Sequence, residues 1–146
     1  MGRIRKVDPE SSKDLEQFCE LMEDLSSGAE NRELLQQKIR DFNAREDCCL
    51  LVMEQDGKLV GSVCGTLFGD FCGDCAPLCA VENVVTHHDY RHQGVMKELF
   101  TELETWMKEK GAKYAFLCSG NSRSGAHRFY QEMGYEEVKG FKKRFL

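Results

Sequence analysis

The sequence predicts an α/β domain in which a mixed, mainly antiparallel sheet is flanked by helices. Apolar runs bounded by turn residues, which are typical of strands, occupy residues 48–54, 58–68 and 78–86. Apolar side chains three to five residues apart, which indicate one face of a helix, follow in residues 95–107. The 146 residues suffice for a sizeable core and contain no linker or repeat, so we predict a single domain over residues 1–146.

The N-terminal third is predicted to hold one strand and two helices. The strand is short and covers residues 4–7. Asp8-Pro9 resembles a helix start, and Ser11 or Ser12 is available as the cap. The Ser-Ser-Gly run at residues 26–28 breaks this helix, and a second helix follows through Phe42.

A β-hairpin is predicted next. Its strands are residues 48–54 and 58–68, and Asp56-Gly57 between them favours a tight turn because glycine tolerates a positive φ. Gly61 and Gly65 weaken the second strand, which indicates a bulge or a close backbone approach at those positions.

The second half of the chain is predicted to alternate between strands and helices. Residues 78–86 form the central strand, and the long helix that follows ends at Gly111, a favourable C-cap. Residues 114–118 form a short strand, and a late helix ends at Gly134. The final residues, through Phe145, are predicted as the last strand or strands, which gives the order β-α-α-β-β-β-α-β-α-β.

The loop Arg91-His92-Gln93-Gly94 lies between the central strand and the long helix. A glycine at the start of a helix lets a ligand approach the free backbone N–H groups closely. Those groups and the helix dipole favour an anion, above all a phosphate. The strand before the loop carries an acid, Glu82. This arrangement predicts a nucleotide-containing cofactor beside a base.

Two segments carry a resemblance to a known family. Arg91-x-x-Gly94, after a strand that reads Glu82-Asn83-Val84-Val85, resembles the pyrophosphate-binding motif of the GNAT superfamily of acyl-CoA-dependent N-acyltransferases. Residues 126–135, AHRFYQEMGY, are similar to the family's late helix, which carries an apolar-Tyr pair and ends in Gly followed by an aromatic residue. The resemblance implies the family fold, in which a bulge often splays the central strand from the next one. Met96 stands where the family prefers Gly or Ala.

The resemblance implies acetyl-CoA as the acyl donor and assigns its binding residues. Backbone N–H groups of residues 93–96 are expected to hold the pyrophosphate, with charge added by Arg91 and a further contact from His92. The pantetheine is expected to pair like an extra strand with the central strand, with Asn121 on the other side of the splay. The predicted cofactor-binding residues are Val84, Val85, Arg91, His92, Gln93, Gly94, Val95, Met96 and Asn121.

The predicted reaction is direct transfer of an acetyl group from acetyl-CoA to a primary amine in a ternary complex. A protonated amine cannot attack a thioester, so a base is required, and Glu82 is the candidate. Strand alternation places Glu82 on the same side as Ala80 and Val84, so we expect partial burial, which disfavours the charged carboxylate. Tyr130 is the candidate general acid for the CoA thiolate. Simple core packing is the alternative for Tyr130, and His127 is a less favoured acid or base.

The eight cysteines require a separate interpretation. Cys72-x-x-Cys75 followed by Cys79 suggests a zinc or redox site, with His87 and His88 as remote ligands. A closed structural zinc site requires four ligands, however, and a Gly-rich hairpin with incidental thiols explains the segment more simply. We therefore expect no metal and regard a metal or redox role as the alternative.

Composition and charge limit the partners. A net charge of −5 argues against nonspecific binding to nucleic acid or anionic membranes. No apolar run reaches membrane-spanning length and the N-terminus lacks an apolar signal core, so we expect a cytoplasmic protein. Family members are often homodimers. The amine acceptor is not determined by the sequence, and a solvated acidic loop is favoured over an amine-recognition patch for Glu23, Asp24 and Glu30. The rival function is a non-catalytic acyl-CoA-binding or sensory domain.

Overall fold

The computed structural model describes residues 2–120 and 124–146. The chain divides into two compact units, Met1–Phe116 (unit 1) and Leu117–Leu146 (unit 2). In chain order unit 1 holds β1 (Arg3–Arg5), α1 (Ser12–Glu23), α2 (Arg32–Ala44), β2 (Cys48–Gln55), β3 (Lys58–Phe68), β4 (Leu78–Thr86), the short 3-10 helix η1 (His88–Tyr90), α3 (Val95–Glu109) and β5 (Ala115–Phe116). Unit 2 contains α4 (Ser124–Glu132).

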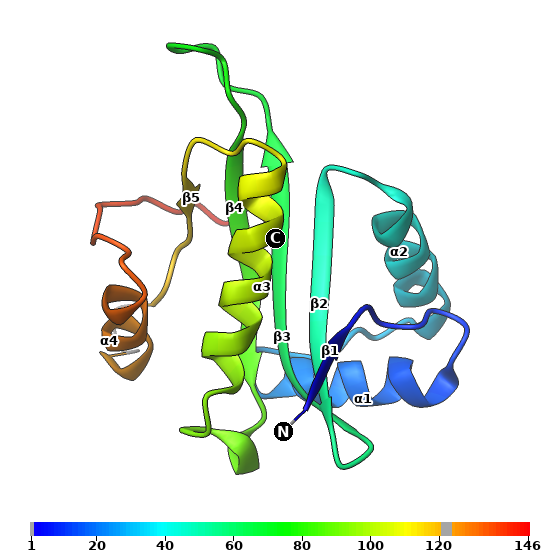
Figure 1. The fold of residues 1–146 in the computed structure, drawn as a ribbon. Coiled ribbons are helices and arrows are strands. Elements are labelled where there is room, and N and C mark those ends of the chain that lie inside the picture. Colours follow the sequence, from blue (N-terminus) through cyan, green and yellow to red (C-terminus); the bar gives the residue numbers. More distant parts are fainter. Residues whose placement is uncertain (1, 121–123) are drawn as a thin grey trace. The chain divides into compact units, whose positions relative to one another are not determined.

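Unit 1 is built on a five-stranded sheet with the order β1-β2-β3-β4-β5. Neighbouring strands are antiparallel from β1 to β4, and β4 and β5 are parallel. Helix α3 lies along one face of the sheet, and α1 and α2 lie on the other (Figure 1). The predicted α/β class with a mixed, mainly antiparallel sheet is confirmed.

Helix α3 packs closely on β3 because two residues of β3 have no side chain. A Cβ atom on Gly61 would lie 2.6 Å from Val95 Cγ1, and one on Gly65 would lie 3.1 Å from Leu103 Cδ1. The helix buries Leu99, Phe100 and Leu103 completely. The two glycines predicted a bulge or a close backbone approach. The register between β2 and β3 shifts beside Gly61, and the atoms closest to both glycines are side-chain atoms, mostly of α3.

The opposite face of the sheet is covered by α1 and α2. Ser11 caps α1 by accepting a hydrogen bond from the Asp14 backbone, so the helix begins after Asp8-Pro9. Asn31 caps α2 by accepting a hydrogen bond from the Leu34 backbone. These helices and the sheet share one core cluster: Val7, Leu15, Phe18, Ile39, Leu50, Val52, Leu59 and Cys64. The buried Asp14 also accepts two hydrogen bonds from the Arg5 guanidinium, which hold the pKa of Asp14 below its usual value.

Turn and strand-end predictions had different outcomes. Asp56 and Gly57 both have a positive φ, 53° and 73°, which confirms the predicted hairpin turn. The strand predicted at residues 114–118 is shorter than expected, covering only Ala115–Phe116. The strand predicted through Phe145 is wrong, because no strand forms in the described residues of unit 2. A strand requires a neighbouring strand as the hydrogen-bond partner of its backbone, and the part of unit 2 that the structure describes contains none.

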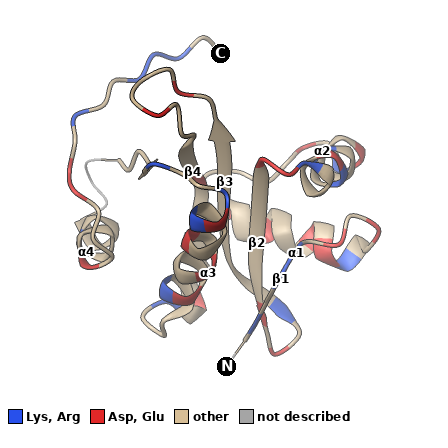
Figure 2. Cartoon of the chain, turned by 45° about the horizontal axis from the view of Figure 1, so that its top comes forward, with Lys and Arg blue, Asp and Glu red and all other residues tan. Residues whose placement is uncertain are grey.

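The helix surfaces carry charges of both signs. Lysine, arginine, aspartate and glutamate alternate around the exposed sides of α2 and α3 (Figure 2). These two helices therefore present no surface of a single sign. Among the helices that the structure describes, none combines the length and the apolar character needed to cross a membrane.

Candidate active site

A bulge interrupts β4 in its second half. Cys64 pairs with Glu82 and Ser62 pairs with Val85, so Asn83 and Val84 together lie opposite a single residue of β3. Asn83 has a φ of 53°, and its carbonyl oxygen accepts a 3.0 Å hydrogen bond from the fully buried Ser62 hydroxyl. Bulges break the regular ladder and redirect backbone groups. The bulge implied by the family resemblance is present.

Glu82 lies at the start of this bulge and its side chain is exposed. The expectation of partial burial is therefore wrong. Alternation assigned Glu82 to the same face as Ala80 and Val84, but both of these are themselves only half-buried. Within unit 1, β5 pairs with β4 only at Cys79 and Ala80, so its cover ends before Glu82. The acid is thus presented to solvent at the end of a paired region.

The thiol of Cys64, which lies opposite Glu82 on β3, has low reactivity. Burial is the main cause that raises the pKa of Cys64 to about 12, and the charges of nearby thiols and of Glu82 add to the effect. A thiol with such a pKa is protonated at neutral pH and is a poor nucleophile. The geometry around Glu82 therefore suits a proton acceptor without a covalent carrier beside it.

The loop between η1 and α3 leaves the start of the helix open. Arg91, His92 and Gln93 are exposed, and His92 and Gly94 have φ values of 62° and 81°. Gly94 is the N-cap of α3, and no side-chain hydrogen bond caps this helix. Apart from its immediate chain neighbours, no atom of the described residues lies within 4 Å of a Cβ built on Gly94. The first N–H groups of α3 are thus presented beside open space, which is the arrangement that binds a phosphate.

The two residues after Gly94 have different environments. Val95 is buried against β3, so it contributes its backbone to the loop and its side chain to the core. Met96 is half-buried. Its backbone belongs to the first turn of α3.

A surface cavity of about 750 Å³ lies next to the same helix end. Its lining comes from the N-terminal strand and from α3 and comprises Gly2, Ile4, Gly94, Lys97, Glu98, Thr101 and Glu102. Gly94 is the only predicted site residue among them. Since no residue of β4 lines it, this cavity does not bring Glu82 together with the open end of α3.

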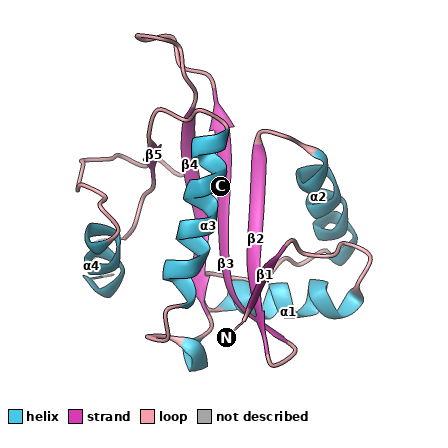
Figure 3. Ribbon diagram, viewed as in Figure 1, coloured by secondary structure: helices cyan, strands magenta, loops and turns pink. Residues whose placement is uncertain are grey.

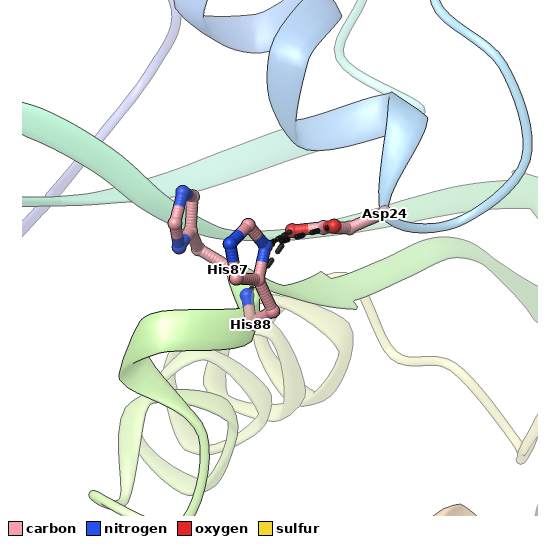
Figure 4. Close-up of side chains that lie close together, drawn as sticks. All are labelled: Asp24, His87 and His88. Carbon is pink, nitrogen blue, oxygen red and sulfur yellow. Dashed lines mark hydrogen bonds and ion pairs between the residues drawn. The ribbon is translucent and has the colours of Figure 1, made fainter.

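A contact that the sequence did not reveal joins the end of α1 to η1, the short helix that follows β4. Asp24 follows the last residue of α1, and its carboxylate lies 3.0 Å from His88 Nδ1 and accepts a 3.1 Å hydrogen bond from the His88 backbone (Figure 4). Burial alone would raise the pKa of Asp24, but the hydrogen bonds from His88 outweigh it and lower the pKa. The pair therefore ties the start of the α1–α2 connection to the segment that leads into the phosphate loop.

A cluster of possible metal ligands is formed by His87 together with Asp24 and His88. Each residue offers one ligand atom, and these atoms all lie within 4.8 Å of one another. The two imidazole rings are stacked, with centroids 4.3 Å apart and planes 23° apart (Figure 4). Imidazole binds a metal through a lone pair in the ring plane, so two nearly parallel rings do not point at a common ion. His87 Nδ1 also accepts a 3.1 Å hydrogen bond from the Asp89 backbone. The geometry favours a structural contact between Asp24 and His88 over a metal site.

Unit 2 carries the second motif on α4. The Tyr135 backbone N–H donates a 2.9 Å hydrogen bond to the Tyr130 carbonyl, and the two rings lie 6.2 Å apart. Gly134 has a φ of 92°, which explains why glycine ends this helix. His127 is on the same helix. Asn121 lies outside the described residues, so its predicted role has no structural counterpart here.

The comparisons with known proteins agree on one family and one fold. The model of the Acetyltransferase (GNAT) family matches residues 15–135. The comparison with curated proteins gave no match. A glucosamine-6-phosphate N-acetyltransferase from Arabidopsis thaliana is similar with a TM-score of 0.87 and 21% identity, over 99% of each chain. An acetyltransferase from Trypanosoma brucei has a TM-score of 0.84 and 22% identity, over 100% of each chain. AAC(6')-Iy, solved with the bisubstrate analog CoA-S-monomethyl-acetylneamine, has a TM-score of 0.77 and 19% identity, over 99% of each chain.

Proposed function

The chain belongs to the GNAT family of acetyltransferases, and we propose that it transfers an acetyl group from acetyl-CoA to a primary amine, directly and within a ternary complex. The observation that carries this proposal is the open N-terminus of α3, which begins at a glycine with a positive φ and has no side-chain cap. It follows, after the short helix η1, a bulged strand that presents an exposed carboxylate, Glu82. A phosphate-binding loop and a base are thus adjacent along the chain.

The proposed cofactor contacts follow from this loop. Backbone N–H groups of residues 93–96 bind the pyrophosphate of acetyl-CoA, and Arg91 and His92 add side-chain contacts. The pantetheine pairs with the backbone of Val84 and Val85, where the bulge interrupts regular pairing. Asn121 contributes a further contact to the pantetheine. In support, AAC(6')-Iy was solved with an analog that contains CoA.

The proposed chemistry uses two side chains. Glu82 accepts a proton from the amine, directly or through a water molecule, and its exposure suits relay through solvent. The amine nitrogen then attacks the thioester carbon, and the backbone N–H of Val84 donates to the developing oxyanion. The C–S bond breaks, and Tyr130 protonates the departing CoA thiolate. The role of Tyr130 rests on the motif at residues 126–135 and not on a distance to Glu82.

An amine is the expected acceptor class. Two structural neighbours are named as a glucosamine-6-phosphate N-acetyltransferase and an aminoglycoside acetyltransferase, and both names refer to amine-bearing sugars. We propose a small amine as the first acceptor class to test, with lysine peptides as the second. A chain that binds acetyl-CoA without any transfer would instead be a non-catalytic acyl-CoA-binding domain.

The test is a panel of amines incubated with acetyl-CoA and the purified protein. Free CoA and acetylated amine are both measured by chromatography, because the exposed thiols of Cys72, Cys75 and Cys118 would react with a colorimetric thiol reagent. We expect equal amounts of the two products with at least one amine. The Tyr130→Phe variant should lose turnover and keep its acetyl-CoA affinity. Parental turnover in that variant would remove the acid assignment, and absence of transfer with every amine would remove the proposed activity.

A further inference from the structure

The loop that joins β3 to β4 carries two exposed cysteines, Cys72 and Cys75. The loop covers residues 69–77 and extends past the end of the sheet, as the long connection at the top of Figure 3 shows. The proposed acetyl transfer makes no use of it. Phe71 in the same loop is 96% exposed, so this segment contributes little to the core.

The backbone of this loop already brings the two cysteines together. The Cys75 N–H donates a 3.0 Å hydrogen bond to the Cys72 carbonyl, which closes a four-residue β-turn. Gly73 has a φ of 59°, which the turn requires and which glycine adopts without strain. The first and last Cα atoms of a β-turn lie within about 7 Å of each other, and a disulfide needs about 4.4–6.8 Å. The turn therefore keeps the Cα atoms of the two cysteines close to the range that a disulfide spans.

Lys113 holds the turn from the other side of the loop. Its Nζ atom donates to the Cys72 carbonyl at 2.9 Å and to the Asp70 carboxylate at 3.1 Å, and it lies 3.4 Å from the Asp74 carboxylate. The side chain of Asp74 in turn accepts a 3.1 Å hydrogen bond from the Ala76 backbone. Residues before, within and after the turn are thus fixed by one lysine and one aspartate.

The other cysteines of unit 1 do not share these properties. All five of them are buried: Cys19, Cys48, Cys49, Cys64 and Cys79. Cys79 is fully buried beneath α3, with its Sγ atom 3.1 Å from the position of a Cβ on Gly65, and burial raises its pKa to about 11. It cannot serve as a third metal ligand beside Cys72 and Cys75 without leaving the core. The geometry at the hairpin tip therefore favours a two-thiol reaction over zinc binding.

We propose that Cys72 and Cys75 form a reversible intramolecular disulfide by exchange with a small-molecule disulfide of the glutathione class. One of the two thiols loses its proton to water, and its sulfur attacks the glutathione disulfide, which releases one glutathione thiolate. The second cysteine then also loses its proton to water, and its thiolate attacks the mixed disulfide, forms the Cys72–Cys75 bond and releases the second glutathione thiolate. The two thiolates take up the two protons, so the cysteines are oxidised and the small disulfide is reduced.

The experiment measures the effective concentration of the two thiols for each other. A Cys118→Ser variant, which lacks the exposed thiol of unit 2, is equilibrated in buffers of varied oxidised and reduced glutathione, quenched by alkylation and analysed by peptide mass spectrometry. The same measurement in urea supplies the unfolded reference. Because the folded turn holds the thiols near each other, we expect an effective concentration about tenfold or more above the unfolded value.

Matched variants separate the turn from the rest of the protein. Cys72→Ser and Cys75→Ser should each abolish the intramolecular product, and Lys113→Met should reduce the effective concentration toward the unfolded value. An unchanged value in Lys113→Met would overturn the role assigned to the lysine. A native value no higher than the unfolded one, or a disulfide that joins either cysteine to a buried one, would overturn the proposal.

Discussion

The two halves of β4 differ although they belong to one strand. Residues 78–81 pair with β3 on one side and, at Cys79 and Ala80, with β5 on the other. Leu78, Cys79 and Val81 are buried. Residues 82–86 contain a bulge, carry exposed side chains at Glu82 and Asn83, and lead into the open loop before α3. The first half is packed in the core, and we propose that the second half forms part of the active site.

The difference shows how a small sheet can hold backbone groups in an irregular arrangement. A regular strand uses its N–H and C=O groups in the ladder and has none to offer a ligand. A bulge frees such groups but costs stability, including the strain of a non-glycine residue with a positive φ such as Asn83. We infer that the packed first half of β4 holds the second half in place. Variants in the two halves should therefore affect different measurements.

The largest expected effect concerns Glu82 in the second half. Glu82→Gln should lower turnover by about 100-fold or more, because the carboxylate that accepts the amine proton is lost. The loss should be smaller at high pH, where more of the amine, with a pKa of about 10.4, is already deprotonated. Steady-state rates across pH with an identified acceptor are the measurement.

The control for Glu82 is another exposed acid on the same unit. Glu20→Gln on α1 should leave turnover unchanged, and both variants should unfold in urea within about 0.5 kcal/mol of the parent because neither side chain is buried. A Glu82→Gln variant with reduced turnover that does not depend on pH would argue against the base assignment. A large loss of stability would mean that the second half of β4 is core as well.

The next effect concerns the loop that the second half leads into. Gly94→Pro should weaken acetyl-CoA binding by about 30-fold, or about 2 kcal/mol, which corresponds to losing one hydrogen bond to a charged group. Proline has no N–H and fixes φ near −65°, whereas Gly94 has a φ of 81°. Calorimetric titration with CoA is the measurement.

Gly111 supplies the matched control for Gly94 because it has a φ of 74° just beyond the other end of α3. Gly111→Pro should destabilise the helix end without weakening CoA binding in the protein that remains folded. Equal losses of CoA affinity in the two variants would show that helix integrity, and not the loop, determines binding.

The first half of β4 is tested by a substitution at Gly65, in the neighbouring strand β3. Gly65 pairs with Val81, and a Cβ on Gly65 would lie 3.1 Å from Cys79 Sγ and 3.2 Å from Trp106 Cζ3. Gly65→Ala should therefore lower the free energy of unfolding by about 1–2 kcal/mol through overpacking. Turnover per folded molecule should stay at the parental level. Urea denaturation and the steady-state rate are both measured.

Gly69→Ala is the control, because a Cβ at that position would have no atom of the described part of the chain within 4 Å, its immediate neighbours in sequence aside. We expect its free energy of unfolding to stay within about 0.5 kcal/mol of the parent. If Gly65→Ala reduced turnover while its stability were unchanged, the division of β4 into a packed half and an active half would be wrong.

Local signals predicted most of the fold, because their causes are local. The turn at Asp56-Gly57 and the close packing at Gly61 and Gly65 each depend on the conformation or the size of single residues. The prediction of a strand through Phe145 was wrong because a strand depends on a neighbouring strand that the local sequence does not specify. The bounds of β3 and β4, by contrast, agree with the predicted ones.

The candidate site was predictable in its loop and less so in its surroundings. Arg91-x-x-Gly94 indicated an open helix start, and the structure contains one. The exposure of Glu82 was missed because alternation predicts a face and does not reveal whether that face is covered. The contact between Asp24 and His88 was missed because the two residues are 64 positions apart. An acid at a helix end and a histidine after a strand were visible, but no local rule pairs them.

The smallest expected effect concerns the hydrogen bond from Ser62 that holds the bulge at Asn83. Ser62 lies in β3 and its hydroxyl donates to the Asn83 carbonyl, so Ser62→Ala should cost about 1 kcal/mol of unfolding free energy. The strained backbone of Asn83 would then have one restraint fewer, and CoA affinity and turnover should fall by more than the fraction unfolded explains. Asn83→Gly in the same background should recover both, since glycine adopts a positive φ without strain. Urea denaturation, CoA titration and steady-state rates on the single and double variants decide the matter. If Ser62→Ala loses stability but keeps parental turnover, the hydrogen bond belongs to the core half of β4, and the boundary between the two halves lies after Asn83.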